Sequence, residues 1–252
     1  MSAARSARRW APAAVAVGVL LSGCATTQQE AARLQLNDAR IRASEQRTLV
    51  TVPGDAVDVT RVTRLTAGGR TAFVVQVRNT GRRPVSDLPI SVGIRVGRKR
   101  PVYINQQSPL ELSYFDSHLP LIAAGRSLTW VYTTGRHLPA HARAIAVVGG
   151  TPSNAAPGTN TPPVIRARAV ALTPPGVAGT SRLAVSLRNL SSVPQYQLQV
   201  YAFAERAGRY VAAGDLTVPH LGSGATSTLK LRILGRINHA PLQIEAPPTI
   251  FQ

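Results

Sequence analysis

The chain has 252 residues, 44% of them apolar, so it can bury a sizeable core and is not globally disordered. Its single cysteine excludes an intrachain disulfide, so hydrophobic packing must hold the fold together. The formal net charge of +18 favours an anionic partner, but aromatic residues make up only 5% of the chain, and base-stacking platforms for nucleic acid are therefore scarce.

The first two dozen residues have the layout of an export signal. A basic start (Arg5, Arg8 and Arg9) precedes a short apolar run over residues 11–21. The next residues complete the stretch Leu21-Ser22-Gly23-Cys24, which resembles the lipobox of bacterial lipoproteins. This resemblance implies that residues 1–23 are removed, that Cys24 carries a diacylglyceryl thioether and that its new amino group is open to acylation, for example with palmitate.

An acylated Cys24 would hold the chain at a membrane surface without spanning the bilayer. Each buried methylene contributes about 0.8 kcal/mol, and two or more acyl chains give stable anchoring where one does not. The alternatives are an ordinary secretory signal and an uncleaved anchor helix, but the apolar run is short for a bilayer, which needs about 20 residues. An unmodified Cys24 would be an odd thiol in an oxidising compartment, which is uncommon. Export also argues against nucleic acid as a partner.

Residues 24–48 are polar and lack the alternation of a strand. Thr27-Gln28-Gln29-Glu30 has the spacing of a helix capping box, and good helix formers follow it. We interpret this segment as a partly helical tether between the membrane and the folded part.

From Leu49 onward, short β-branched runs alternate with clusters of Gly, Pro, Asn and Ser. In the first unit, residues 49–150, this pattern predicts strands over 57–65, 71–79, 90–96, 102–104, 127–133 and 144–148. Residues 151–163 are rich in proline and turn formers, as in a linker. A second strand-rich unit, residues 164–252, follows.

The two units are internal repeats of each other. Residues 71–79 match residues 181–189 at a constant offset of 110, and both segments end in Arg-Asn. Residues 121–129 match residues 220–228 at an offset of 99, so the first unit holds an insertion, which we place around residues 107–118. Two matches in the same order favour duplication over chance.

Units of about 90–100 residues with short strands and frequent turns predict an all-β fold of two tandem immunoglobulin-like β-sandwiches. The succession of strand, Arg-Asn turn, proline and alternating strand is similar to immunoglobulin-like modules of bacterial cell-envelope proteins. In the second unit, residues 196–203, 208–214 and 222–224 resemble modules of the CARDB and FxLYD types. The Cys-Trp-Cys signature of antibody domains is absent, and another small β-sandwich is the alternative.

The sequence lacks a Gly-x-Ser-x-Gly elbow, a phosphate-binding Gly-rich loop and a His-Glu-x-x-His motif. His137 and His141 are four residues apart, but Pro139 breaks a helix between them, so we interpret them as part of a turn and predict no metal site. Asp116 and His118 form a loop candidate, either as a catalytic Asp-His pair or as an Asx turn over an aromatic plug, and we favour the plug. We therefore predict a protein that is not an enzyme and needs no cofactor, with this inserted loop kept as a candidate binding site.

Residues 97–100 are expected to form the tip of a hairpin. Arg95, Arg98, Lys99 and Arg100 place four positive groups around one tight turn, and an anionic lipid or polymer would relieve their repulsion. The alternative is a solvated loop whose charges discourage edge-to-edge pairing.

These features together predict a non-catalytic lipoprotein of the cell envelope, anchored on the extracytoplasmic face and, in a bacterium with two membranes, on the outer membrane. It would bind or scaffold an envelope protein partner through loops and sheet edges. The alternatives are polyanion or anionic-lipid binding through the hairpin and an envelope enzyme accessory or hydrolase that uses the Asp116–His118 loop.

Overall fold

The computed structural model describes residues 49–106, 113–150, 162–173 and 179–249. Within these ranges the chain is all-β, as the sequence predicts, with thirteen strands in antiparallel pairs and one 3-10 turn, Tyr114–Asp116. Cys24, the tether and residues 151–161 of the linker lie outside the described residues, so what the sequence predicts for them stays a prediction. In the described part no helix has the length and apolarity needed to cross a membrane.

The first half of the fold, residues 49–150, consists of two facing sheets. β1 (Val57–Ala67), β2 (Arg70–Asn79) and β6 (Ser127–Thr134) form one sheet. β3 (Leu88–Arg95) pairs with β4 (Val102–Tyr103), β5 (His118–Leu119) and β7 (Arg143–Val148) in the other. The six strands predicted here are all present with ends shifted by two residues at most, whereas the sequence does not predict the two-residue β5.

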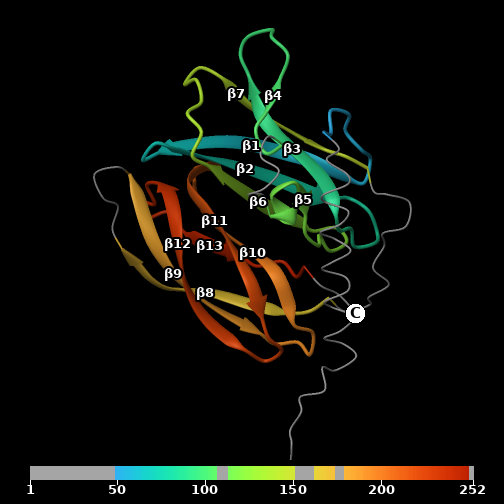
Figure 1. The fold of residues 1–252 in the computed structure, drawn as a ribbon, viewed down its shortest axis with the longest axis vertical. Helices are drawn as coiled ribbons and strands as arrows, with labels where there is room; N and C mark the ends of the chain where they lie inside the picture. The colour runs from blue at the N-terminus through green and yellow to red at the C-terminus, as the bar shows by residue number, and fades with distance from the viewer. Residues whose placement is uncertain (1–48, 107–112, 151–161, 174–178, 250–252) are drawn as a thin grey trace, which may run out of the picture.

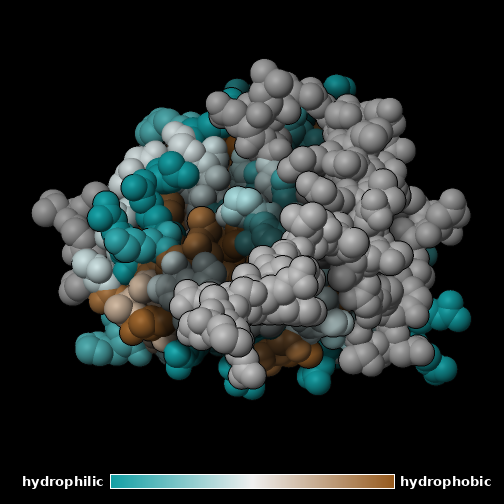
Figure 2. Space-filling model, turned by 60° about the horizontal axis from the view of Figure 1, so that its bottom comes forward, coloured by the Kyte–Doolittle hydropathy of each residue, from teal (hydrophilic) through white to brown (hydrophobic). Residues whose placement is uncertain are grey.

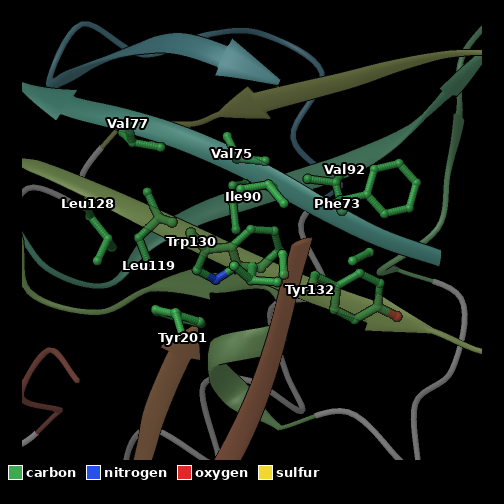
Figure 3. Close-up of a cluster of buried hydrophobic side chains, with 14 of the residues drawn as sticks. Phe73, Val75, Val77, Ile90, Val92, Leu119, Leu128, Trp130, Tyr132 and Tyr201 are labelled. Atoms are coloured by element: carbon green, nitrogen blue, oxygen red, sulfur yellow. The ribbon is translucent and has the colours of Figure 1, made fainter. Parts of the chain in front are cut away.

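Alternation along the strands directs apolar side chains between these two sheets. Phe73, Val75 and Val77 of β2 and Trp130 of β6 meet Ile90 and Val92 of β3 in one fully buried cluster (Figure 3).

The second half is a single sheet of six strands that is folded around its own core. Its strands are β8 (Ile165–Thr173), β9 (Thr180–Asn189), β10 (Gln195–Arg206), β11 (Arg209–Leu221), β12 (Thr226–Gly235) and β13 (Leu242–Glu245), in the order β13-β10-β11-β12-β9-β8. Only two residue pairs join β11 to β12, Ala212 with Gly235 and Ala213 with Leu234. Apolar side chains from both sides of this narrow seam gather in one buried cluster, which includes Val185 of β9, Leu231 of β12, and Leu198 and Val200 of β10.

The two halves share the same strand register. In the first half Arg78 lies opposite Ser127, and in the second half Arg188 lies opposite Thr226. These pairs differ by the predicted offsets of 110 and 99 residues. On the other side of each half, Tyr103 lies opposite Gly93 and Leu119 lies opposite Leu88, where the second half has Ala213 opposite Phe203 and Val218 opposite Leu198. The offset therefore changes between Tyr103 and Leu119, which is where the insertion was expected.

A buried asparagine closes the same turn in both halves. The Nδ2 group of Asn79 donates to the carbonyls of Arg83, Ile122 and Ala123 at 2.8–3.3 Å. The Nδ2 group of Asn189 donates to the carbonyls at the three equivalent positions, Val193, Leu221 and Gly222, at 2.8–3.4 Å. Each Oδ1 atom accepts the backbone N–H two residues ahead, so the repeated Arg-Asn of the sequence marks a repeated structural turn.

The second half packs against the first (Figure 1). Tyr201, Phe203 and Tyr210, on β10 and β11, belong to the buried core cluster of the first half. They meet the outer face of β2 and β6, where Ala72 and Val131 are at most 2% exposed. The linker composition predicts two joined units but not this packing, which depends on the outward-facing residues of the strands.

Candidate functional site

The described part of the inserted loop, residues 113–118, lies between the two halves and contacts both. Ser113 begins its 3-10 turn, and the Asp116 carboxylate accepts the Ser113 N–H at 3.0 Å. Phe115 is buried, and its carbonyl accepts the indole N–H of Trp130 at 3.1 Å. The Asn105 amide donates to the Asp116 carbonyl at 2.9 Å. The bonds from Trp130 and Asn105 fix the loop against the first half.

His118 is engaged in packing within the same loop. Its ring stacks on that of Tyr114, with centroids 4.1 Å apart and planes 3° from parallel. Its Nδ1 atom lies 3.1 Å from the Ser117 hydroxyl and 3.2 Å from the Tyr114 carbonyl. Burial lowers the pKa of His118 to about 4, so the ring is neutral at neutral pH. Among the described residues, the side-chain hydrogen bonds of Asp116 and His118 thus go to the loop itself and not from one to the other.

The loop also reaches the second half through polar contacts. The Ser113 hydroxyl donates to Gln197 Oε1 at 3.1 Å and accepts the Gln199 amide at 3.3 Å. At another point of the boundary, Arg61 forms an ion pair with Glu205 at 3.0 Å and lies 5.0 Å from the centre of the Tyr210 ring. The inserted loop therefore forms hydrogen bonds to both halves and helps to hold them together.

The second half carries a row of polar side chains close to the inserted loop. Tyr201 of β10 is opposite Glu245 of β13 on one side and Asp215 of β11 on the other. Directly opposed residues on neighbouring strands have their Cβ atoms about 5 Å apart, so the three side chains form a cross-strand row. The backbone N–H of Thr129, on β6 of the first half, donates to Glu245 Oε2 at 3.0 Å.

Burial changes the acidity of the carboxyl groups at this boundary. It raises the pKa of Glu245 to about 7 and that of Asp215 to about 6. Burial, with the charge of Asp215 added to it, raises the pKa of Asp116 to about 7. Asp215 Oδ1 and the Tyr201 hydroxyl are buried and have no hydrogen-bond partner among the residues that the structure describes. Within the described residues no group of three or more His, Cys, Asp and Glu side chains could hold a metal ion.

The sequence does not single out Asp215 or Glu245, because an isolated acidic residue in a strand is normally expected to face solvent. For Asp215 the available signal is strand alternation. Asp215 lies two residues after Ala213 on β11, so its side chain points to the same side of the sheet, and the side chain of Ala213 faces the first half. Recognising it requires knowing that this face is covered.

The basic hairpin forms where it is predicted. Gly93 and Ile94 of β3 pair with Tyr103 and Val102 of β4, and the Lys99 N–H donates to the Val96 carbonyl at 3.1 Å. Arg95, Arg98, Lys99 and Arg100 are all exposed. Arg143 of β7 lies opposite Arg95 and adds a fifth positive charge. The hairpin follows the end of β3 at Arg95, whereas His118 pairs with Pro89 near its start, so the structure does not bring the two predicted sites together.

Comparisons with known proteins do not assign the chain to a family. No protein-family model matches it, and no curated protein matches its sequence. Among solved structures, the exo-chitosanase CsxA of Amycolatopsis orientalis has 17% identity and a TM-score of 0.25 over 71% of this chain and 25% of that one. Red sea bream transglutaminase has 14% identity and a TM-score of 0.22 over 74% of this chain and 29% of that one. The chain spans little more than a quarter of these enzymes, and similarity at this level carries no argument about function.

Proposed function

We propose that this protein is a non-catalytic lipoprotein of the cell envelope that binds or scaffolds an envelope partner. The observation that carries the proposal is the use of Asp116 and His118, the most chemically suggestive pair in the sequence, as packing groups of a plug. A catalytic pair would need the two side chains to meet each other and a substrate. Here their hydrogen bonds go to residues of their own loop.

The folded part is best interpreted as two immunoglobulin-like sandwiches stacked on one another. Equivalent strands pair in equivalent registers, and each half encloses an apolar cluster of its own. The packing of Tyr201 and Phe203 against the first half favours a rigid pair of sandwiches over two sandwiches that move independently. Such a body suits a spacer or scaffold that presents its loops at fixed separations.

The anchor of the proposal is the thioether at Cys24. Residues 24–48 would reach at most about 90 Å when fully extended, which sets how far the folded part can stand from the membrane. The test is mass spectrometry of the mature protein together with membrane fractionation. We expect cleavage before Cys24, a diacylglyceryl adduct with or without a further palmitate, and release of a Cys24→Ser variant into the soluble fraction when membranes are washed at high ionic strength. A mature chain that begins at Met1 with an unmodified thiol would refute the proposal.

The non-catalytic part of the proposal has its own test. A His118→Ala variant that remains folded should bind the partner recovered by membrane crosslinking as well as the parent does. Any hydrolytic activity of the parent that disappears in this folded variant would instead support the enzyme or enzyme-accessory alternative.

A second candidate function is polyanion binding through the hairpin. It is favoured by the exposure of Arg98, Lys99 and Arg100 at one tip, with Arg143 adding charge beside Arg95. Binding to an anionic polymer should weaken with salt and fall when the three tip residues are changed to Ser. Affinity that does not respond to salt or to this triple substitution would remove this candidate.

A further inference from the structure

The largest basic surface of the described chain is a sheet face and not the hairpin. Six exposed cations project from the outer face of β8, β9 and β12, hereafter the basic face: Arg166, Arg168, Arg182, Arg188, Lys230 and Arg232. Their common side follows from the register, because Arg166 lies opposite Arg188, and Arg182 lies opposite Arg232. The three strands contain no Asp or Glu.

Among the described residues, acidic side chains do not compensate the charge of this face. No ion pair joins any of the six side chains to an acidic residue of the described part. Neighbouring strands are about 4.8 Å apart and alternate residues about 7 Å apart, so the cations form an array over three strands of roughly 10 by 20 Å. Positive groups held this close raise the local potential and attract a surface of opposite charge.

The duplicated half provides an internal comparison. The positions equivalent to Arg182, Lys230 and Arg232 are Ala72, Val131 and Thr133 in the first half, at the same register. In the first half this face packs against the second half around the buried Ala72 and Val131, and its other positions include Arg61 and Arg78, the latter equivalent to Arg188. In the second half no described residue covers the same face. Three of its six cations, Arg182, Lys230 and Arg232, thus occupy positions that are uncharged in the covered first half.

Exposed apolar side chains border the basic face. Val164 and Leu190 are 55% and 43% exposed, and they continue the alternation of Arg166 and Arg188 on the same side of the sheet. The Leu190 N–H donates to the Val164 carbonyl, so the pairing of β8 with β9 extends to these two residues. Figure 2, which turns the lower end of Figure 1 toward the viewer, shows apolar and hydrophilic surface side by side.

We propose that the basic face docks on the surface of a membrane that contains anionic phospholipid. The cations would contact lipid phosphates, and the bordering apolar side chains would enter the headgroup region. An array that is spread over three strands matches a two-dimensional lipid surface better than a linear polymer, and the apolar border has no role in binding a soluble polyanion. The inference deepens the proposed function by naming the surface that the folded part contacts, and it does not require the acyl group at Cys24.

The test uses the expected mature chain, residues 24–252, with Cys24→Ser, so that neither acylation nor the basic and apolar N-terminal segment can contribute. Sedimentation with vesicles of equal parts phosphatidylglycerol and phosphatidylcholine is compared with vesicles of phosphatidylcholine alone. One variant carries Arg182→Gln, Lys230→Gln and Arg232→Gln, and a second, independent variant carries Arg166→Gln, Arg168→Gln and Arg188→Gln. The control with the same net charge carries Arg82→Gln, Arg83→Gln and Arg126→Gln, which are exposed residues of the first half. Thermal unfolding of each variant verifies its fold.

The parent chain should bind the anionic vesicles, and each triple substitution in the basic face should weaken binding on the order of 100-fold, since each basic residue at an anionic surface contributes about fivefold. The control should retain the parent's binding, and Val164→Ser with Leu190→Ser should weaken vesicle binding but not binding of soluble polyphosphate. Raising the ionic strength from about 0.1 M to about 1 M should release the parent, because the Debye length falls from about 10 Å to about 3 Å.

Equal losses in the control and the face variants would overturn the proposal, since net charge alone would then explain binding. Binding of polyphosphate without binding of anionic vesicles would overturn it as well, in favour of a polymer. Neither result bears on cleavage and acylation at Cys24, which are measured on the chain with its native cysteine.

Discussion

Replacing Asp215 with Asn should stabilise the folded chain at neutral and alkaline pH. Burial raises the pKa of Asp215 from 3.8 to about 6, so the folded chain keeps a proton that the unfolded chain has already released between these two values. The contribution of Asp215 to stability is therefore greatest below pH 4 and is lost as the pH rises to about 6. A shift of about two units corresponds to about 3 kcal/mol, and an uncharged Asn avoids that cost while keeping an oxygen that can accept the Thr133 hydrogen bond.

Urea unfolding of the parent and the Asp215→Asn variant over a range of pH measures this effect. The variant should gain about 1–3 kcal/mol at about pH 8 and almost nothing at about pH 4. Asp58→Asn, at an exposed position of β1, is the matched control and should give no pH-dependent gain. Destabilisation by Asp215→Asn of the same size at both pH values would refute the reasoning, because the hydrogen bonds of the carboxylate would then outweigh its burial.

Further substitutions test the fold. Asn79→Ala and Asn189→Ala should each lower the free energy of unfolding by at least about 2 kcal/mol in chemical denaturation, because each leaves several turn carbonyls unpaired, and clearly unequal losses would contradict the equivalence of the two turns. Gly93→Ala should cost about 1–3 kcal/mol in the same assay, since a Cβ there would overlap the Val102 carbonyl oxygen of β4, whereas Gly150→Ala has open space and should be neutral. Trp130→Phe should cost about 1–3 kcal/mol by leaving the carbonyl of the plug loop unpaired, and an unchanged melting temperature would show that this bond is not needed.

The strands and their order of repetition could be predicted because they depend on local patterns. Alternation identified the inward trio Phe73, Val75 and Val77, and the repeated Arg-Asn identified the turn that Asn79 and Asn189 close. The change of offset located the insertion, since every later pairing in the first half is displaced by the same number of residues. Each of these inferences needs only the chain and the period of a strand.

The packing between the halves and the carboxyl row could not be predicted in this way. Glu245, Tyr201 and Asp215 become neighbours only when β13, β10 and β11 pair in one register. Their raised pKa values require in addition that the first half and its inserted loop cover them. Both conditions depend on long-range contacts that no short window of sequence contains.

The same reasoning explains why the sequence pointed to the hairpin and overlooked the basic face. Arg98, Lys99 and Arg100 are consecutive, so they stand out in a sequence. Arg182, Lys230 and Arg232 are spread over two strands and separated by up to 50 residues, and they meet only through the antiparallel register of β9 and β12. Duplication then assigns different roles to one sheet face. In the first half the buried Ala72 and Val131, together with the ion pair of Arg61, let it pack against the second half, and in the second half, where nothing in the described chain covers it, cations keep it soluble and give it an affinity for negative surfaces.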